Sequence, residues 1–234
     1  MHIIPVIDLM HGQVVQAIQG QRQSYRAIQS QLTESHALLD VVAAILQVYP
    51  FDCVYIADLN AITGDSTLAN HRDHIAAAIQ AFPHITWWVD AGLSSVAALK
   101  PWLHDAIQPI LASESLPDLQ TYQQLRVMAA NSVLSLDYFQ DGFHGPASLQ
   151  TDHALWSQPS IVMSLPNVGA KLGPDLHRLQ SLKQKTGASL YAAGGVRHIA
   201  DIQALAQTGA DGVLIASALH QKQISAADLH KLQP

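Results

Sequence analysis

The sequence predicts a single (β/α)8 barrel over residues 1–234. Short apolar segments recur about once every 29 residues, the spacing of a strand followed by a helix. Amphipathic helical patterns lie between these segments, and the two halves of the chain resemble each other. An open doubly wound sheet is the alternative. The chain length, the number of units and the internal repeat favour a closed ring.

The apolar segments are nearly continuous, which is typical of parallel strands covered on both faces. The expected strands are residues 3–9, 53–59, 85–91, 107–113, 132–137, 160–165, 189–195 and 211–217. Helical patterns occupy residues 36–49, 174–186 and 198–208, and a short helix over 225–232 ends the chain. Ser94, Pro174 and Ser225 are residue types that suit helix starts.

Residues 90–116 resemble residues 192–219. In each segment a glycine ends a strand and opens a helix, and an Ala-Ser pair ends the next strand. A repeat of four strand–helix units predicts two half-barrels that present similar groups on opposite sides of one mouth. Chance similarity between two α/β segments is the alternative.

Composition excludes several classes of function. Apolar residues make up 49% of the chain and charged residues 13%, so a large core is expected and disorder is not. Twelve basic against eighteen acidic residues, without a basic run, argue against nucleic-acid binding. No apolar run approaches the roughly 18 residues of a membrane helix. The start of the chain lacks a signal-peptide pattern, which predicts a cytoplasmic protein, and Cys53, the single cysteine, is expected to be buried.

The ends of the last two expected strands predict a phosphate site. Gly194 and Gly195 follow the seventh strand, and Ala216 and Ser217 follow the eighth. Glycine lets backbone amides approach an anion closely, and the start of a helix adds unpaired donors. These two loops are also the usual phosphate site of such barrels.

The repeat predicts a second phosphate site at Gly92 and Ser113. Here Asp90 stands in place of a glycine and brings a carboxylate close to the expected anion. A ligand with a phosphate at each end would use both sites.

Asp8 and Asp137 end the first strand of each half-barrel, so they are expected to face each other across the mouth. Two carboxylates in different environments are able to act as general base and general acid on one substrate. The alternative is that one or both only bind loop backbone.

The long first loop, residues 20–30, carries Arg22, Tyr25 and Arg26. These side chains either close over an anionic ligand or form a solvated flap. Thirteen histidines suggest metal binding, and His71 and His74 share one helix face, but no third ligand is apparent. No phosphate-binding loop or dinucleotide fingerprint follows a strand, so neither a metal nor an organic cofactor is predicted.

The motifs IIPVIDLMHGQVV, VYIADLNAITG, AAGGVRHIADI and DGVLIASAL, in this order from residue 2 to about residue 224, resemble the histidine-biosynthesis barrels. That family comprises ProFAR isomerase (HisA) and the related cyclase (HisF). The resemblance implies a half-barrel duplication, two phosphate sites and a cofactor-independent Amadori isomerisation. By motif position it implies Asp8 as the base and Asp137 as the acid.

The chain departs from the family pattern at three strand ends. A glycine triplet is replaced by Asp90-Ala91-Gly92, a charged pattern by the neutral segment 163–169, and a Gly-Arg type pair by Ala216-Ser217. The segments QRQSYRAIQS, VDAG and LPNVGAKLGPD resemble a side branch of methanogens and methylotrophs. That branch implies a link to one-carbon carriers such as tetrahydromethanopterin or methanofuran.

The primary hypothesis is a metal-independent isomerase that acts on a phosphorylated ribotide or amino-sugar. The alternatives are different chemistry in the synthesis of a one-carbon carrier, or a non-catalytic barrel that binds a phosphorylated ligand. A cyclase-like partner of a glutaminase is a third possibility, and it would require an ammonia path through the barrel. The sequence leaves the oligomeric state open.

Overall fold

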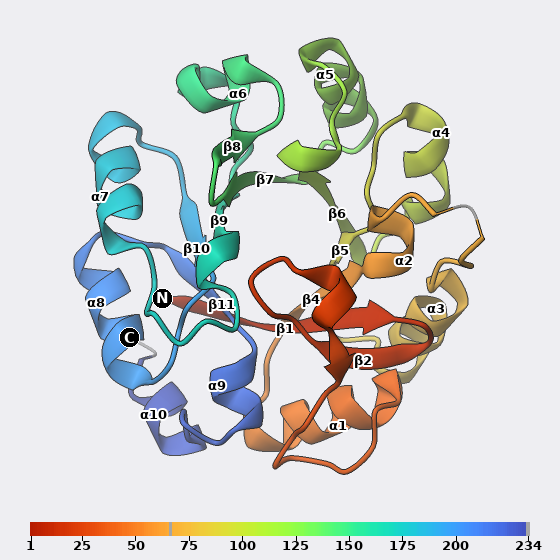
Figure 1. Cartoon of the computed structure of the whole chain (residues 1–234), viewed down its shortest axis with the longest axis vertical. Coiled ribbons are helices and arrows are strands. Elements are labelled where there is room, and N and C mark those ends of the chain that lie inside the picture. Colours follow the sequence, from red (N-terminus) through yellow and green to blue (C-terminus); the bar gives the residue numbers. More distant parts are fainter. Residues whose placement is uncertain (66, 233–234) are drawn as a thin grey trace.

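A computed structural model describes residues 1–65 and 67–232. Eight parallel strands form a ring (Figure 1): β1 (His2–Met10), β4 (Cys53–Asp58), β5 (Thr86–Asp90), β6 (Ile107–Ala112), β7 (Val133–Phe139), β9 (Ser160–Ser164), β10 (Leu190–Ala193) and β11 (Gly212–Ile215). The ring closes because β11 pairs with β1, with His2 opposite Gly212 and Pro5 opposite Ile215. Each expected strand segment overlaps one of these strands, and the predicted (β/α)8 barrel is confirmed.

Helices surround the ring (Figure 1): α1 (Leu38–Val48), α2 (Leu59–Ile62), α3 (Arg72–Ala81), α4 (Val96–Leu99), α5 (Leu119–Met128), α6 (Ala147–Thr151), α7 (Leu176–Lys185), α8 (Ile199–Gln207), α9 (Ser217–His220) and α10 (Ala226–His230). Ser225 caps α10 in a capping box with Asp228, as its residue type predicts. The other two predicted starts are off by one residue, because Ser95 and Asp175 supply the caps of α4 and α7. Among the described helices, none is long and apolar enough to cross a membrane.

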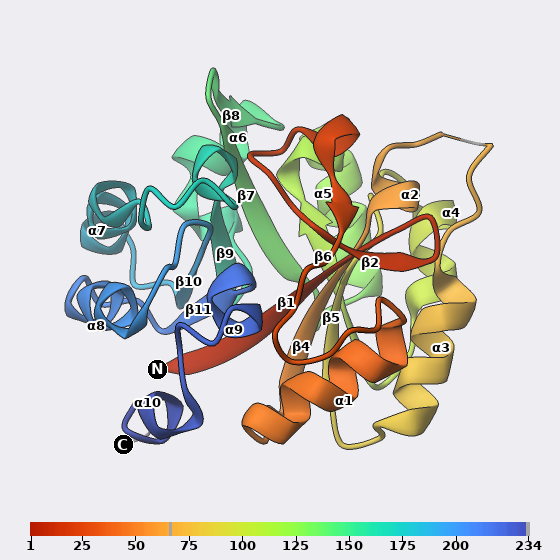
Figure 2. The same ribbon diagram turned by 60° about the horizontal axis from the view of Figure 1, so that its bottom comes forward.

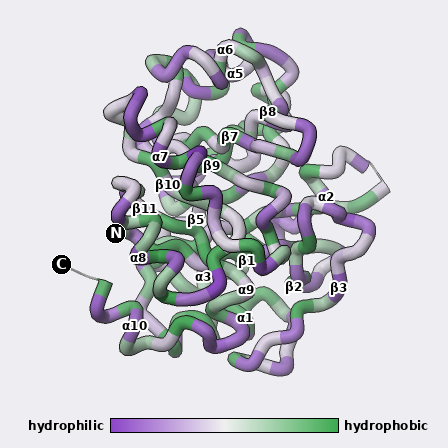
Figure 3. Tube along the Cα trace, turned by 60° about the vertical axis from the view of Figure 1, so that its left-hand side comes forward, coloured by the Kyte–Doolittle hydropathy of each residue, from purple (hydrophilic) through white to green (hydrophobic). Residues whose placement is uncertain are grey.

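The strands are buried on both faces, as their continuous apolar pattern predicts. One cluster of apolar side chains lies between the ring and its helices, and a second, with Ile4, Ile110 and Ile161, fills the barrel interior. Figure 3 shows most of the strand segments in the hydrophobic colour. Cys53 is buried in the interior cluster.

Aromatic side chains fill the barrel interior at the amino ends of the strands. The rings of Trp88 and Tyr191 lie 5.2 Å apart. The Tyr191 hydroxyl contacts His2 Nδ1 at 3.1 Å, and His2 Nε2 contacts Asp52 at 2.9 Å. These groups occupy the end of the barrel through which a cyclase-like function would have to pass ammonia.

At the carboxyl ends of the strands, β1 extends beyond the ring into a small antiparallel sheet with β2 (Gln13–Gln16) and β3 (Arg26–Ala27). A buried pair fixes the β1–β2 turn: His71 Nδ1 contacts Asp58 Oδ1 at 2.7 Å, and the Gly12 amide donates to His71 Nε2 at 2.9 Å. Because Nε2 accepts, the ring proton lies on Nδ1 and the hydrogen bonding of His71 is complete. His71, a metal candidate from its spacing to His74, therefore supports the hairpin.

The aromatic filling predicts that a methyl group at Gly212 is costly. A Cβ atom there would overlap the Tyr191 ring. Gly212→Ala is expected to lower the free energy of unfolding by about 1–3 kcal/mol, the usual cost of overpacking. Gly187→Ala is the matched control, because no atom lies within 4 Å of its added Cβ. Denaturant unfolding of both variants tests this, and equal midpoints would contradict it.

Candidate active site

A cavity of about 410 Å³ opens at the carboxyl ends of the strands. Of the residues predicted to form the site, it is lined by Asp8, Arg22, Asp137, Gly194, Gly195, Ala216 and Ser217. Gly92, Ser113 and Arg26 lie outside its lining. The volume falls within the usual range for small-molecule sites. The structure thus brings the two predicted carboxylates and the predicted phosphate loops after β10 and β11 into one space.

Asp8 lies in the wall of this cavity, near the end of β1. Within the described residues its carboxylate accepts no hydrogen bond, and the side chain is only half-buried towards the cavity. Burial raises the pKa of Asp8 from 3.8 to about 7, with Arg22 lowering it and Asp90 raising it further. Asp8 is therefore free to exchange a proton with a ligand near neutral pH.

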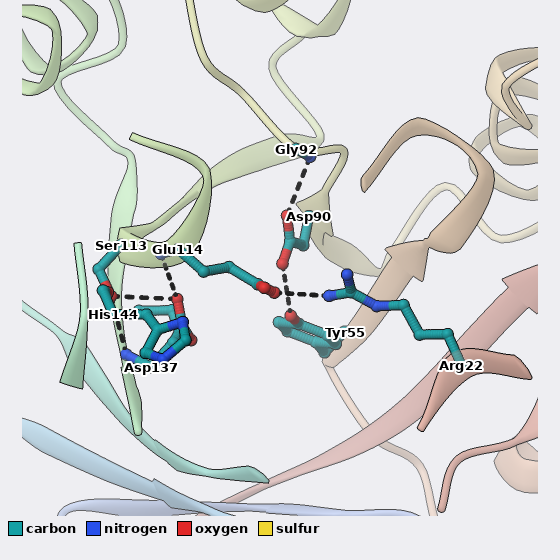
Figure 4. Close-up of polar contacts among 9 residues, drawn as sticks. Arg22, Tyr55, Asp90, Gly92, Ser113, Glu114, Asp137 and His144 are labelled. Atoms are coloured by element: carbon teal, nitrogen blue, oxygen red, sulfur yellow. Dashed lines mark hydrogen bonds and ion pairs between the residues drawn. The ribbon is translucent and has the colours of Figure 1, made fainter. Parts of the chain in front are cut away.

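Asp137, near the end of β7, is buried and held from several directions (Figure 4). Ser135 donates to its Oδ1 at 2.6 Å, and the Glu114 amide donates to its Oδ2 at 3.1 Å. Its own amide donates to the Ser113 hydroxyl at 2.9 Å. Burial raises the pKa of Asp137 to about 7, although the Ser135 hydrogen bond opposes the shift. Its carboxyl group has a fixed orientation and holds a proton part of the time at neutral pH.

Asp90, at the end of β5, adds a third carboxylate to the cavity (Figure 4). The Tyr55 hydroxyl donates to Asp90 Oδ2 at 3.2 Å, and the Gly92 amide donates to Asp90 Oδ1 at 3.1 Å. Burial also raises the pKa of Asp90 to about 7. The sequence placed a carboxylate here but gave no sign of Tyr55, because that residue reads as an ordinary strand residue. We call Asp90, Glu114 and Asp137 the acidic corner.

The predicted second phosphate site is closed in this structure. Ser113 is fully buried, and its hydroxyl donates to the His144 carbonyl at 2.6 Å. The Gly92 amide is taken by Asp90. Neither the Ser113 hydroxyl nor the Gly92 amide is presented to a ligand.

The loops after β10 and β11 form the opposite side of the cavity. Gly194 and Gly195 have φ angles of 100° and 89°, a region that glycine alone adopts without strain. A Cβ atom at either position would overlap a backbone carbonyl, that of Ser164 or that of Gly173. We call Gly194, Gly195, Ala216 and Ser217 the amide corner. Its glycines bring bare backbone to the cavity surface, as a phosphate site requires.

His220, at the end of α9, also lines the cavity and was missed by sequence reasoning. The side chain is 2% exposed, Nδ1 contacts the Ser30 hydroxyl at 3.0 Å, and Nε2 has no partner in the described part of the chain. Burial lowers the pKa of His220 to about 4, so the ring is neutral at pH 7. The Ser30 hydroxyl that contacts Nδ1 also accepts from the Leu32 amide.

The first loop lies across the mouth of the barrel (Figure 2). The Gln19 amide donates to the Val168 carbonyl at 2.7 Å, and Arg22 pairs with Glu114 at 2.6 Å. Tyr25 lines the cavity, whereas Arg26 is exposed and bonds the Tyr25 carbonyl. The loop therefore covers the site, and the Arg22 guanidinium is already paired with a carboxylate of the protein.

Histidine, cysteine and acidic side chains do not gather into a metal-binding group of three or more among residues 1–65 and 67–232.

The closed ring of parallel strands, with carboxylates and glycine-rich loops at its carboxyl end, defines a (β/α)8 barrel protein. Residues 2–225 match the family described as histidine biosynthesis protein, and the chain belongs to this family.

Individual relatives are more distant. An uncharacterised protein of Methanocaldococcus jannaschii is 28% identical over 228 residues, which cover 94% of each chain. Several relatives are named as phosphoribosyl imidazole-carboxamide isomerases, that is, ProFAR isomerases, among them one of Methanoregula boonei and one of Listeria monocytogenes serotype 4a. The protein of Methanoregula boonei is 26% identical over 97% of this chain and 98% of its own. The protein of Listeria monocytogenes serotype 4a is 23% identical over 100% of this chain and 98% of its own.

The raised pKa of Asp8 predicts a pH-dependent cost to stability. The folded chain keeps a proton on Asp8 up to about pH 7, whereas the unfolded chain loses it near 3.8. Stability from this group is therefore greatest at low pH and falls as the pH rises between these values. Asp8→Asn should raise the free energy of unfolding by about 1 kcal/mol or more near pH 8 and have little effect near pH 4.

Denaturant unfolding across this pH range measures the effect. Asp105→Asn, at an exposed position, is the control and should leave the pH profile unchanged. If Asp8→Asn raised the free energy of unfolding by the same amount at every pH, the raised pKa of Asp8 would be contradicted.

Proposed function

We propose that the protein is a metal-independent isomerase that converts a phosphorylated aldose amine, a ribotide or an amino-sugar, into the corresponding ketose. One observation carries this proposal: Asp8, Asp137 and the amide corner line the same cavity. Membership in the histidine biosynthesis family and the names of the isomerase relatives support the same class of reaction.

Phosphate binding would position the substrate. The backbone amides of Gly194 and Gly195 and those at the start of α9 would donate to the phosphate at the amide corner, beside the buried, neutral His220 ring. Fixing the phosphate sets the reacting carbons against both carboxylates and converts binding energy into orientation.

Asp137 would act as the acid. With its pKa raised to about 7, it holds a proton part of the time at neutral pH, and the hydrogen bonds that it accepts from Ser135 and the Glu114 amide fix the orientation of the carboxyl group. Transfer of that proton to the ring oxygen breaks the C1–O bond, and the amine nitrogen forms an iminium with C1.

Asp8 would act as the base. Its carboxylate accepts no hydrogen bond within the described residues and is free to take the proton from C2. The C2–H electrons form the C1–C2 double bond and neutralise the iminium nitrogen. Return of a proton to C1 and loss of the C2 hydroxyl proton give the ketose and restore both side chains.

The mechanism predicts that Asp8→Asn strongly slows turnover but keeps ligand affinity. Purified protein is to be incubated in D2O with ProFAR and with simpler N-substituted 5-phosphoribosylamines, and the ketose followed by NMR. The wild type should form ketose with one deuterium at C1. Asp8→Asn should be slower by about 10²–10⁴-fold, the usual contribution of general base catalysis.

Inorganic phosphate affinity in Asp8→Asn should remain close to that of the wild type, and Asp105→Asn should match the wild type in both measurements. Full activity of Asp8→Asn, or no ketose from any of these substrates, would contradict the proposal. The second result would favour a binding barrel or different chemistry.

A further inference from the structure

The internal repeat lets the two sides of the mouth be compared residue by residue. Gly195 and Ser217 of the amide corner correspond to Gly92 and Ser113 on the β5–β6 side. The first pair lines the cavity and the second does not. The two half-barrels have therefore become different at the positions where the repeat predicts the same ligand group.

On the β5–β6 side, carboxylates of the protein occupy the donors that an anion would use (Figure 4). The Gly92 amide donates to Asp90 at 3.1 Å, and the Glu114 amide donates to Asp137 at 3.1 Å. The Ser113 hydroxyl is turned to the His144 carbonyl at 2.6 Å. A phosphate would have to displace two buried carboxylates to reach these groups.

Charge opposes an anion at this side as well. Asp8 and the acidic corner contribute four carboxyl groups to the cavity lining, and Arg22 already pairs with Glu114. Carboxylate oxygens accept several hydrogen bonds each, so Asp90 is able to accept from a ligand in addition to Gly92 and Tyr55. Such a surface attracts N–H groups and positive charge and repels phosphate.

The opposite side of the cavity supplies donors. The glycines of the amide corner bring backbone to the cavity wall, and the buried His220 ring lies in the same wall with no partner for its Nε2 atom in the described residues. A cavity with hydrogen-bond donors on one side and acceptors on the other selects a ligand that has an acceptor group, such as a phosphate, at one end and N–H donors at the other.

We propose that the substrate carries a single phosphate, bound at the amide corner, and a nitrogen group with N–H donors, bound at the acidic corner through Asp90. This inference rests on the proposed function and narrows its substrate class to amine-bearing monophosphates. The isomerase relatives differ in this respect, because their names describe a substrate with two phosphoribosyl groups.

Calorimetric titration with three stable sugar phosphates tests the inference. Glucose 6-phosphate and glucosamine 6-phosphate differ in one amine, and fructose 1,6-bisphosphate adds a second phosphate. The wild type should bind glucosamine 6-phosphate at least about tenfold more tightly than glucose 6-phosphate. The bisphosphate should bind no more tightly than glucose 6-phosphate.

Two variants assign the effect to Asp90. Asp90→Asn keeps the shape of the side chain and should remove the preference for the amine. Asp90→Gly frees the Gly92 amide and should raise affinity for the bisphosphate at least about tenfold, because an anion gains a donor and loses a repelling charge. Asp105→Asn, exposed and far from the lining, should behave as the wild type.

The outcomes separate the two proposals. Tighter binding of the bisphosphate by the wild type, or an amine preference that survives Asp90→Asn, overturns the inference and leaves the isomerase proposal standing. Equal binding of glucose 6-phosphate and glucosamine 6-phosphate by the wild type also overturns the inference and leaves the isomerase proposal standing. If none of the three ligands binds, the phosphate site itself is refuted and both proposals fail.

Discussion

The parallel pairing of β11 with β1 is the constraint on which the rest of the structure depends. It closes the ring and brings the amide corner, at the end of the chain, beside Asp8, near its start. The two ends of the closed ring differ. Tyr191 and Trp88 fill the interior towards the amino ends of the strands, whereas the cavity opens at the carboxyl ends. All of the chemistry is therefore confined to one mouth under the first loop.

Burial of acidic groups at that mouth determines what chemistry is available. Asp8, Asp90 and Asp137 share one cause for a pKa near 7, the removal of their carboxyl groups from water. The charge of Asp90 also raises the pKa values of Asp8 and Asp137. Such an arrangement costs folding stability and is retained where proton transfer or recognition needs it.

Local patterns in the sequence were sufficient for the ring and for one side of the site. Continuous apolar runs identify the strands, and Gly194 and Gly195 signal a backbone that bare glycine alone can adopt. The acidic corner was only partly predictable. Which donor each carboxylate takes depends on contacts between distant segments, such as the Tyr55 hydroxyl on Asp90 and the Arg22–Glu114 pair. His220 gave no sequence signal, because its role follows from burial against Ser30.

The amide corner and the acidic corner give the mouth two chemically different sides, and a crystal structure of the protein grown or soaked with inorganic phosphate tests this difference most directly. We expect one ordered anion, bound by the Gly194 and Gly195 amides within reach of His220 Nε2. Asp90 should still accept from the Gly92 amide. An anion bound by Gly92 and the Glu114 amide, with Asp90 turned away, would contradict the account.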